Sequence, residues 1–108
     1  NSISGPFKNA LDWLSREKPY AFRGKPLLLM GATSGKAQAL QGIAQTRIPL
    51  TFLGSYIYPA WLGIAHGATA FSEDGTKLTD KSSQERLISL VDEFLVFAER
   101  HARTPAKT

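Results

Sequence analysis

The sequence predicts an α/β protein in which parallel strands alternate with helices, and three observations support this. Residues 26–30 form a short, continuous apolar run, which suits a strand covered on both faces and is too short for a buried helix. Apolar residues at helical spacing come before and after this run. The elements read in the order α, β, α, β, α along 108 residues, the length of one domain.

The first helix is predicted to begin at Gly5 and Pro6, because proline suits the first helical turn, where its missing N–H costs little. One apolar face then follows at i, i+3, i+4 and i+7, made by Phe7, Ala10, Leu11 and Leu14. A polar connection over residues 16–25 leads into the strand at 26–30, which ends at Gly31.

Residues 31–35 are predicted to be a loop, and Lys36 to about Arg47 a second helix. The apolar side of this helix is expected to carry Ala39, Leu40, Ile43 and Ala44. We expect the helix to end or kink at Pro49, because proline removes a backbone donor. The second strand is predicted at 55–59. Residues 60–75 are predicted to be irregular, with a turn at Glu73-Asp74-Gly75.

The final helix is the clearest element, with Thr79 or Asp80 as its cap; Ser82 and Glu85 form a capping box if it starts later. Its apolar stripe is expected to comprise Leu87, Leu90, Val91, Phe94, Leu95 and Ala98. The predicted domain unit covers residues 1–102, and residues 103–108 are expected to fray.

The composition is that of an ordinary globular protein, with 43% hydrophobic and 20% charged residues. The absence of cysteine excludes disulfides and cysteine-based zinc sites, and it fits a reducing compartment, so we expect a cytoplasmic protein. No apolar run approaches the roughly 20 residues needed to cross a bilayer. The net charge of +4 is scattered along the chain, which favours a solvated surface over a nucleic-acid patch.

Two predicted strands are too few for the three amphipathic helices that surround them. A doubly wound sheet needs about five strands, and two would leave an open edge and uncovered helix faces. The sequence therefore predicts part of a doubly wound domain, whose remaining strands lie outside this chain.

The first sixteen residues carry the most specific motif. The run Lys8-Asn9-Ala10-Leu11-Asp12-Trp13, after a polar loop at Asn1 to Gly5, resembles a loop-and-helix motif of the NADPH-dependent FMN reductase family, whose members are flavodoxin-like quinone, chromate and azo reductases. This chain has Ser4-Gly5-Pro6 where the family usually has x-Pro-Gly. Residues 65–80 also resemble the family, with Ser72 replacing an aspartate. The resemblance runs in order to about residue 100 and implies the C-terminal half of a flavodoxin-like domain.

The resemblance implies an FMN-dependent oxidoreductase, active only with its N-terminal half. Electrons would pass from NAD(P)H through FMN to a quinone, an azo compound, a metal oxyanion or free flavin. On the matching loops, the residues expected to bind FMN are Asn1, Ser2, Ile3, Gly5, Thr33, Ser34 and Gly35. No side chain is needed as a catalytic acid, no metal is expected, and the completed unit is expected to be a homodimer or tetramer. Its N-terminal half is expected to derive from the same precursor.

Other candidate sites have simpler interpretations. The loop from Gly31 to Lys36 lacks the Walker spacing, and Ala37 replaces the magnesium-binding hydroxyl. Trp61 follows the second predicted strand and either lines a substrate pocket or packs at a surface or subunit interface. His66 and His101 each lack a second ligand at metal spacing.

Two other functions remain open. A non-catalytic half-domain acting as an interaction module would bind no flavin. A flavodoxin-like electron carrier would hold FMN without reacting with NAD(P)H, although such carriers are usually acidic and this chain has a pI of about 9.6.

Overall fold

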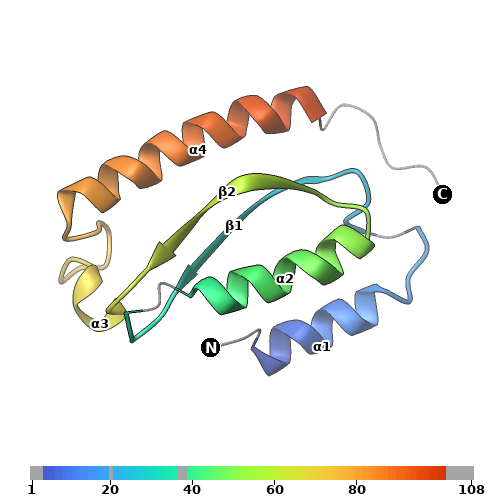
Figure 1. The fold of residues 1–108 in the computed structure, drawn as a ribbon, viewed down its shortest axis with the longest axis horizontal. Helices are drawn as coiled ribbons and strands as arrows, with labels where there is room; N and C mark the ends of the chain where they lie inside the picture. Colours follow the sequence, from blue (N-terminus) through green and yellow to red (C-terminus); the bar gives the residue numbers. More distant parts are fainter. Residues whose placement is uncertain (1–3, 20, 37–38, 102–108) are drawn as a thin grey trace.

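A computed structural model of the chain describes residues 4–19, 21–36 and 39–101. Its elements are, in order, α1 (Gly5–Leu14), β1 (Pro26–Ala32), α2 (Leu40–Phe52), β2 (Tyr56–Ile64), α3 (Gly67–Ala70) and α4 (Lys81–His101). The helices α1 and α2 lie on one side of the sheet, and α4 lies on the other (Figure 1). The predicted alternation of helices and strands is therefore confirmed.

The two strands form a parallel sheet, as the sequence predicts. Pro26 is paired with Tyr56 at one end and Ala32 with Ile64 at the other. The register shifts between Leu27 and Leu29, where β2 carries the extra residues around Pro59. A proline cannot donate to a strand ladder, so a bulge is the position where the sheet tolerates it.

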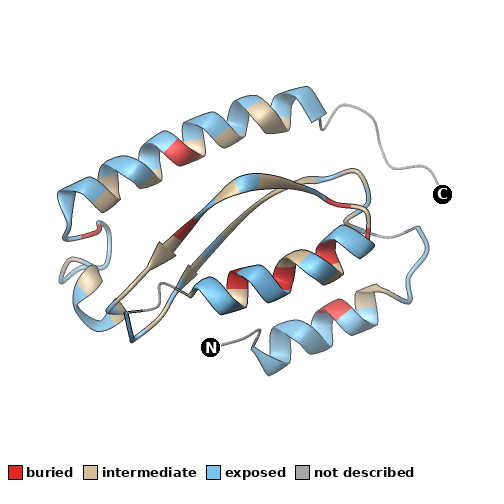
Figure 2. Cartoon of the chain, viewed as in Figure 1, coloured by how far each residue is buried: buried red, intermediate tan, exposed pale blue. Residues whose placement is uncertain are grey.

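The core lies between α1, α2 and the N-terminal halves of the two strands. Leu11, Leu50 and Leu53 are buried together, and Phe22, Leu27, Leu29 and Ile57 pack around them. Buried residues are concentrated along the inner side of α2, whereas the strands are mostly half-buried (Figure 2). Half-buried strands are unusual for a parallel sheet, whose faces are normally covered by helices.

Both predicted bounds of the second helix are wrong, because α2 begins at Leu40 instead of Lys36 and continues through Pro49 to Phe52. Pro49 withholds only its own N–H from the carbonyl of Gln45, while its carbonyl accepts a hydrogen bond from Leu53 N at 3.0 Å. The burial of Leu50 and Leu53 stabilises the last turn against the loss of one hydrogen bond. The predicted apolar side is also only partly correct, because Ile43 is buried but Leu40 is exposed.

The prediction that residues 60–75 are irregular is wrong over its first half. The strand β2 extends to Ile64, and α3 occupies Gly67–Ala70. The sequence beyond Pro59 is a weak strand signal, because a proline precedes it and because Ala60 and Gly63 have low strand propensity. The predicted turn is confirmed, since Gly75 N donates to Ser72 O at 2.8 Å.

Within this turn, the Asp74 carboxylate accepts hydrogen bonds from the hydroxyl groups of Ser72 and Thr76 and from Thr76 N. These bonds, that from Ser72 first, lower the pKa of Asp74 from 3.8 to about 2. Because the folded pKa is lowered, the stabilising contribution is present above pH 3.8 and is lost as the pH falls towards 2.

We expect an NMR titration of the Asp74 carboxyl carbon to give a pKa near 2. The substitution Ser72→Ala removes the largest cause and should raise this pKa, whereas Ser89→Ala on α4 should leave it unchanged. A wild-type titration with the ordinary aspartate pKa would contradict this account of the turn.

Asp80 caps α4, as predicted, by accepting a hydrogen bond from Ser83 N at 3.0 Å. The side chains of Ser83 and Ser82 also donate to it, and together these bonds lower the pKa of its carboxyl group. The inner side of α4 includes Leu90, which is buried, and Phe94, whose ring meets that of Tyr58 edge-on. Of the helices in the described ranges, none combines the length and hydropathy needed to cross a bilayer.

Candidate functional site

The candidate site lies where the carboxyl ends of β1 and β2 meet, which is where ligands gather in doubly wound folds. Backbone hydrogen bonds join the loops that follow the two strands. Thr33 N donates to Ile64 O at 2.9 Å, and Gly67 N donates to Thr33 O at 2.8 Å. His66 N donates to Gly35 O at 2.8 Å. The loop over residues 33–35 is thus held in place by the segment after β2.

The side of the 33–35 loop that faces away from Gly67, called its outer side below, is open at Gly35. Gly67 backs closely against it, because a Cβ at Gly67 would lie 3.3 Å from Thr33 O. A Cβ at Gly35, in contrast, would meet nothing within 4 Å. Thr33 is half-buried, and Ser34 and Gly35 are exposed. Ser34 and Gly35, two of the three predicted residues, are therefore exposed to solvent on a loop whose backbone is held by hydrogen bonds.

The N-terminus of α1 points towards the same end of the molecule as the carboxyl ends of the strands (Figure 1). Its cap residue, Ser4, makes no side-chain hydrogen bond to the helix, and the proline expected in the first turn is present. The N–H groups of this first turn are thus free of a side-chain acceptor from the cap, and they carry the positive end of the helix dipole. Gly5 has open space where a Cβ would stand. The predicted residues Asn1, Ser2 and Ile3 lie outside the described residues.

On α1, the Asp12 carboxylate lies one turn from two basic residues, Lys8 and Arg16, and it pairs with Lys8. Lys8 Nζ lies 2.7 Å from the Asp12 carboxylate, and the Arg16 guanidinium stands 5.6 Å from the centre of the Trp13 ring. Lys8, like Arg16, lies one turn from Asp12, and the structure selects Lys8. Trp13 is mostly exposed, so it contributes little to the core of this chain.

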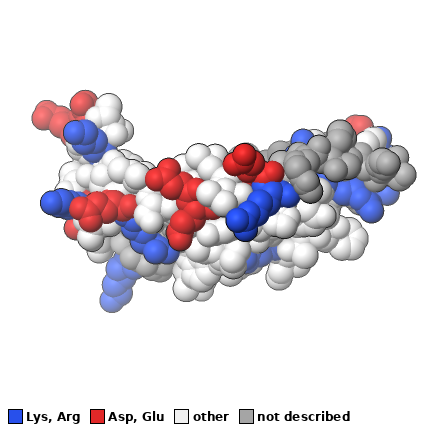
Figure 3. Space-filling model, turned by 90° about the horizontal axis from the view of Figure 1, so that it is seen from above, with Lys and Arg blue, Asp and Glu red and all other residues white. Residues whose placement is uncertain are grey.

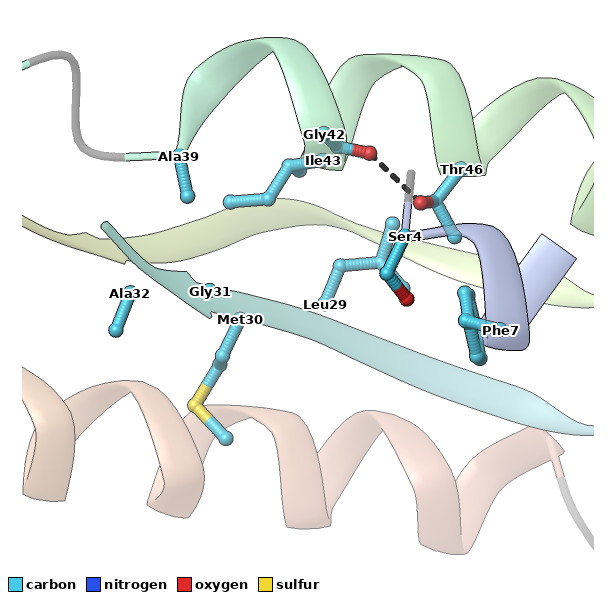
Figure 4. Close-up of a pocket in the computed structure, with 10 residues that line it drawn as sticks. All are labelled: Ser4, Phe7, Leu29, Met30, Gly31, Ala32, Ala39, Gly42, Ile43 and Thr46. Atoms are coloured by element: carbon cyan, nitrogen blue, oxygen red, sulfur yellow. Dashed lines mark hydrogen bonds between the residues drawn. The ribbon is translucent and has the colours of Figure 1, made fainter. Parts of the chain in front are cut away.

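A cavity of about 430 Å³ lies beside β1 (Figure 4). Its walls are formed by the start of α1, by four consecutive residues of β1 and by the first half of α2. The lining comprises Ser4, Phe7, Leu29, Met30, Gly31, Ala32, Ala39, Gly42, Ile43 and Thr46. No described residue of β2 contributes, so the cavity lies on the side of β1 away from β2.

Trp61 lies on β2 beside two arginines that the sequence did not single out. The Arg47 guanidinium stands 5.3 Å from the centre of the Trp61 ring and donates to Pro59 O at 3.1 Å. From the opposite side of the sheet, Arg86 donates to Trp61 O at 3.2 Å. Both arginines therefore hydrogen-bond to backbone carbonyl groups of β2 at its bulge. The only sequence signal for this role is the position of each arginine relative to the buried face of its helix.

Of the two histidines, only His66 lies at the candidate site. It adopts a left-handed conformation with φ of 51° between β2 and α3. It also lines a second, smaller cavity of about 210 Å³ with Thr69, Thr79 and Asp80, whose side chains are already hydrogen-bonded within the protein. His101, at the other end of the molecule, packs against Phe97 with ring centres 4.5 Å apart.

Comparisons with known proteins give one consistent result. Residues 1–69 match the sequence profile of a family described as NADPH-dependent FMN reductase. An NAD(P)H-dependent FMN reductase of Pseudomonas aeruginosa is 32% identical to the chain over 84 residues, which is 77% of this chain and 45% of that protein.

Among solved structures, the fold is similar to that of FerB, a flavoenzyme NAD(P)H:(acceptor) oxidoreductase from Paracoccus denitrificans. The TM-score is 0.77 and the identity 29%, and the match covers 93% of this chain and 56% of FerB. The chain thus spans about half the length of the proteins it resembles. With its parallel two-stranded sheet between helices, it has the architecture predicted for part of a flavodoxin-like domain.

Proposed function

Because the chain belongs to the NADPH-dependent FMN reductase family, we propose that it supplies one side of an FMN site in an NAD(P)H-dependent oxidoreductase. The observation that carries this proposal is the pair of cross-linked loops at the carboxyl ends of β1 and β2. The loop over residues 33–35 is fixed by backbone bonds to His66 and Gly67, and its outer side is free. FMN, when bound, supplies the hydride and electron chemistry, so the chain needs only to bind and orient it.

The residues present fit a flavin in two respects. A planar ring needs a surface without projecting side chains, and the open space above Gly35 and Gly5 provides it. The ring edge carries hydrogen-bond acceptors and gains negative charge on reduction, which suits the N–H groups at the start of α1. We assign ring contacts to Thr33, Ser34 and Gly35 and to the segment from Asn1 to Gly5.

The cavity beside β1 fits a protein strand better than the cofactor. Four consecutive strand residues form its floor, and an unpaired strand edge offers backbone groups to a further strand rather than to a ring. We propose that an N-terminal half contributes this strand, so that residues 1–102 form the second half of one flavodoxin-like domain. The same half would provide the phosphate contacts, and the completed unit would be a homodimer or tetramer.

The electron acceptor is proposed to be a quinone, an azo compound, a metal oxyanion or free flavin. With one face of the ring against the 33–35 loop, the opposite face would be open to a planar acceptor or nicotinamide, without a catalytic side chain from this chain.

Replacing Gly35 with valine tests this site in the natural protein, with any further polypeptide that completes it retained. A Cβ at Gly35 meets no atom within 4 Å, so folding should be unchanged, but the valine side chain would fill the space that the ring needs. We expect the Kd for FMN to rise at least about 10-fold, which corresponds to a loss of about 1.4 kcal/mol of binding free energy. The quenching of flavin fluorescence measures this affinity.

The matched control is Ser89→Val on the exposed side of α4, which should leave both affinity and thermal stability unchanged. A protein that is folded but binds no FMN would overturn the flavin proposal in favour of a non-catalytic half-domain. FMN binding without oxidation of NAD(P)H would point to an electron carrier. Equal FMN affinity of the Gly35→Val and Ser89→Val variants would show that the ring does not pass over Gly35.

A further inference from the structure

The smaller of the two cavities lies on the α4 side of the sheet, where the end of β2, α3 and the start of α4 come together (Figure 1). Its volume is about 210 Å³. It is lined by residues 63–66 after the bulge of β2, by α3, and by the segment that leads into the first turn of α4. The described lining includes no residue of β1, so strands added beside β1 would leave this cavity in place.

Apart from the imidazole of His66, the polar side chains of this cavity offer a ligand hydrogen-bond acceptors rather than donors. The Thr79 hydroxyl donates to Thr69 O at 3.0 Å, and the Thr69 hydroxyl donates to His66 O at 3.3 Å. The Ser83 hydroxyl donates to the Asp80 carboxylate at 2.7 Å. Each hydroxyl proton is thus used inside the protein, and only the oxygen lone pairs remain for a ligand. A ligand in this cavity has to bring its own donors.

The strongest acceptor in the cavity is the second oxygen of the Asp80 carboxylate. The hydrogen bonds from Ser82 Oγ, Ser83 N and Ser83 Oγ all reach the same oxygen, Oδ2. Within the part of the chain that the structure describes, no hydrogen bond reaches Oδ1. The three bonds hold the carboxylate in place and, with that from the Ser83 hydroxyl first, lower its pKa, so it is ionised at neutral pH. A hydrogen bond from a ligand hydroxyl to such an oxygen is charge-assisted and strong.

The size and the charge of the cavity indicate a sugar. Its volume equals that of about seven water molecules at ~30 Å³ each, which suits one sugar ring and is too small for a whole nucleotide. The described lining contains no lysine or arginine, and acidic and basic side chains are interspersed over the face above α4 (Figure 3). A phosphate group would therefore meet the Asp80 carboxylate without a cation to compensate. The cavity favours a neutral group that carries hydroxyls.

His66 joins this cavity to the candidate flavin site. Its backbone N–H donates to Gly35 O at 2.8 Å in the 33–35 loop, and the same residue lines the cavity. A nicotinamide dinucleotide has two nucleoside ends separated by a pyrophosphate. Its nicotinamide can therefore lie against the open face of the flavin while its adenosine ribose lies beyond His66.

We propose that this cavity binds the adenosine ribose of the nicotinamide dinucleotide, and that Asp80 accepts hydrogen bonds from its 2′- and 3′-hydroxyl groups. In dinucleotide-binding folds, an acidic residue binds the free 2′-hydroxyl of NADH, whereas an arginine accommodates the 2′-phosphate of NADPH. Asp80 thus selects NADH over NADPH, a preference opposite to the one in the family's description. The inference rests on the proposed NAD(P)H-dependent function and assigns the nucleotide that it uses.

Calorimetric titration with the oxidised nucleotides tests the preference without turnover. The natural protein is used, with FMN and any completing polypeptide retained, at pH 8, where ordinary histidines are neutral. We expect NAD+ to bind at least about 10-fold more tightly than NADP+, the effect of one hydrogen bond to a charged group. The substitution Asp80→Asn removes the charge and keeps a residue that caps helices equally well, so Tm should be unchanged. In this variant the preference should fall below about 3-fold.

The matched control is Asp92→Asn, which removes a carboxylate from the exposed side of α4 and does not touch the cavity. This variant should keep the wild-type ratio of the two Kd values. The carboxyl-carbon NMR signal of Asp80 should also shift when NAD+ is added, whereas that of Asp92 should stay in place. Equal affinity of the wild type for both nucleotides, or an unchanged ratio in Asp80→Asn, would overturn the ribose site.

Reduction of the bound FMN separates a failure of this inference from a failure of the proposed function. The loss of visible flavin absorbance on anaerobic mixing with NADH or NADPH needs no electron acceptor. Reduction by both nucleotides with equal apparent Kd values would leave the proposed function standing and overturn the ribose site. Reduction by neither nucleotide would overturn both.

Discussion

Replacing Leu11 with alanine is expected to lower the free energy of unfolding by about 3 kcal/mol, within the 2–5 kcal/mol typical of buried leucines. Leu11 is 2% exposed and is the buried residue of α1. It packs with Leu50 and Leu53 of the α2 end, where Phe22, Leu27, Leu29 and Ile57 also converge. Its truncation opens a cavity at the point where α1, α2 and the sheet meet.

Urea unfolding followed by circular dichroism measures this change, with the midpoint shifting and the slope staying the same. The control is Ile88→Ala, an exposed apolar residue on α4, which should change stability by less than about 0.5 kcal/mol. Equal effects of the two substitutions would mean that α1 is not held by this cluster.

Replacing Gly31 with alanine is expected to destabilise the protein by about 1–3 kcal/mol, the usual cost of overpacking. The new Cβ would lie 2.8 Å from the Ala39 Cβ and 3.7 Å from Ile43 Cγ1. Ala39 has little freedom to retreat, because it precedes α2 in a left-handed conformation with φ of 57°. The strand and helix must therefore separate at the base of the 33–35 loop.

Thermal unfolding of Gly31→Ala beside Gly35→Ala checks this prediction. A Cβ at Gly35 meets no atom within 4 Å, so that variant should keep the wild-type Tm. If both variants melt at the wild-type temperature, Gly31 is not required for the close approach of β1 and α2.

The sequence was sufficient for elements whose local signals agree with their surroundings. Pro6 marks the start of α1, the apolar run marks β1, and Asp80 caps α4. It failed where tertiary contacts decide. Pro49 reads as a helix end, but the burial of Leu50 and Leu53 continues α2 beyond it. The second half of β2 has a weak pattern of its own, and it is a strand because β1 pairs with it up to Ile64.

For the candidate site, the family resemblance identified the 33–35 loop. The sequence could not identify the residues after β2 that hold this loop in place. Hydrogen bonds from His66 N and Gly67 N are backbone interactions, which leave little trace in residue type; only the tight space at Gly67, where a Cβ would lie 3.3 Å from Thr33 O, favours a particular residue. The sequence also did not reveal that Leu40, Ile48 and Phe52 of α2 are exposed, because an apolar residue on a predicted helix is assigned to the core by default.

The two edges of the sheet differ in what they offer to another strand. Beside β1 there is an unpaired edge and an apolar cavity, whereas at the bulge of β2 the carbonyl groups of Pro59 and Trp61 already accept hydrogen bonds from Arg47 and Arg86. An incoming strand at β2 would have to displace two guanidinium groups before it could bond there. The two edges of the sheet are therefore unequal, and a further strand would add more readily beside β1 than at the bulge of β2.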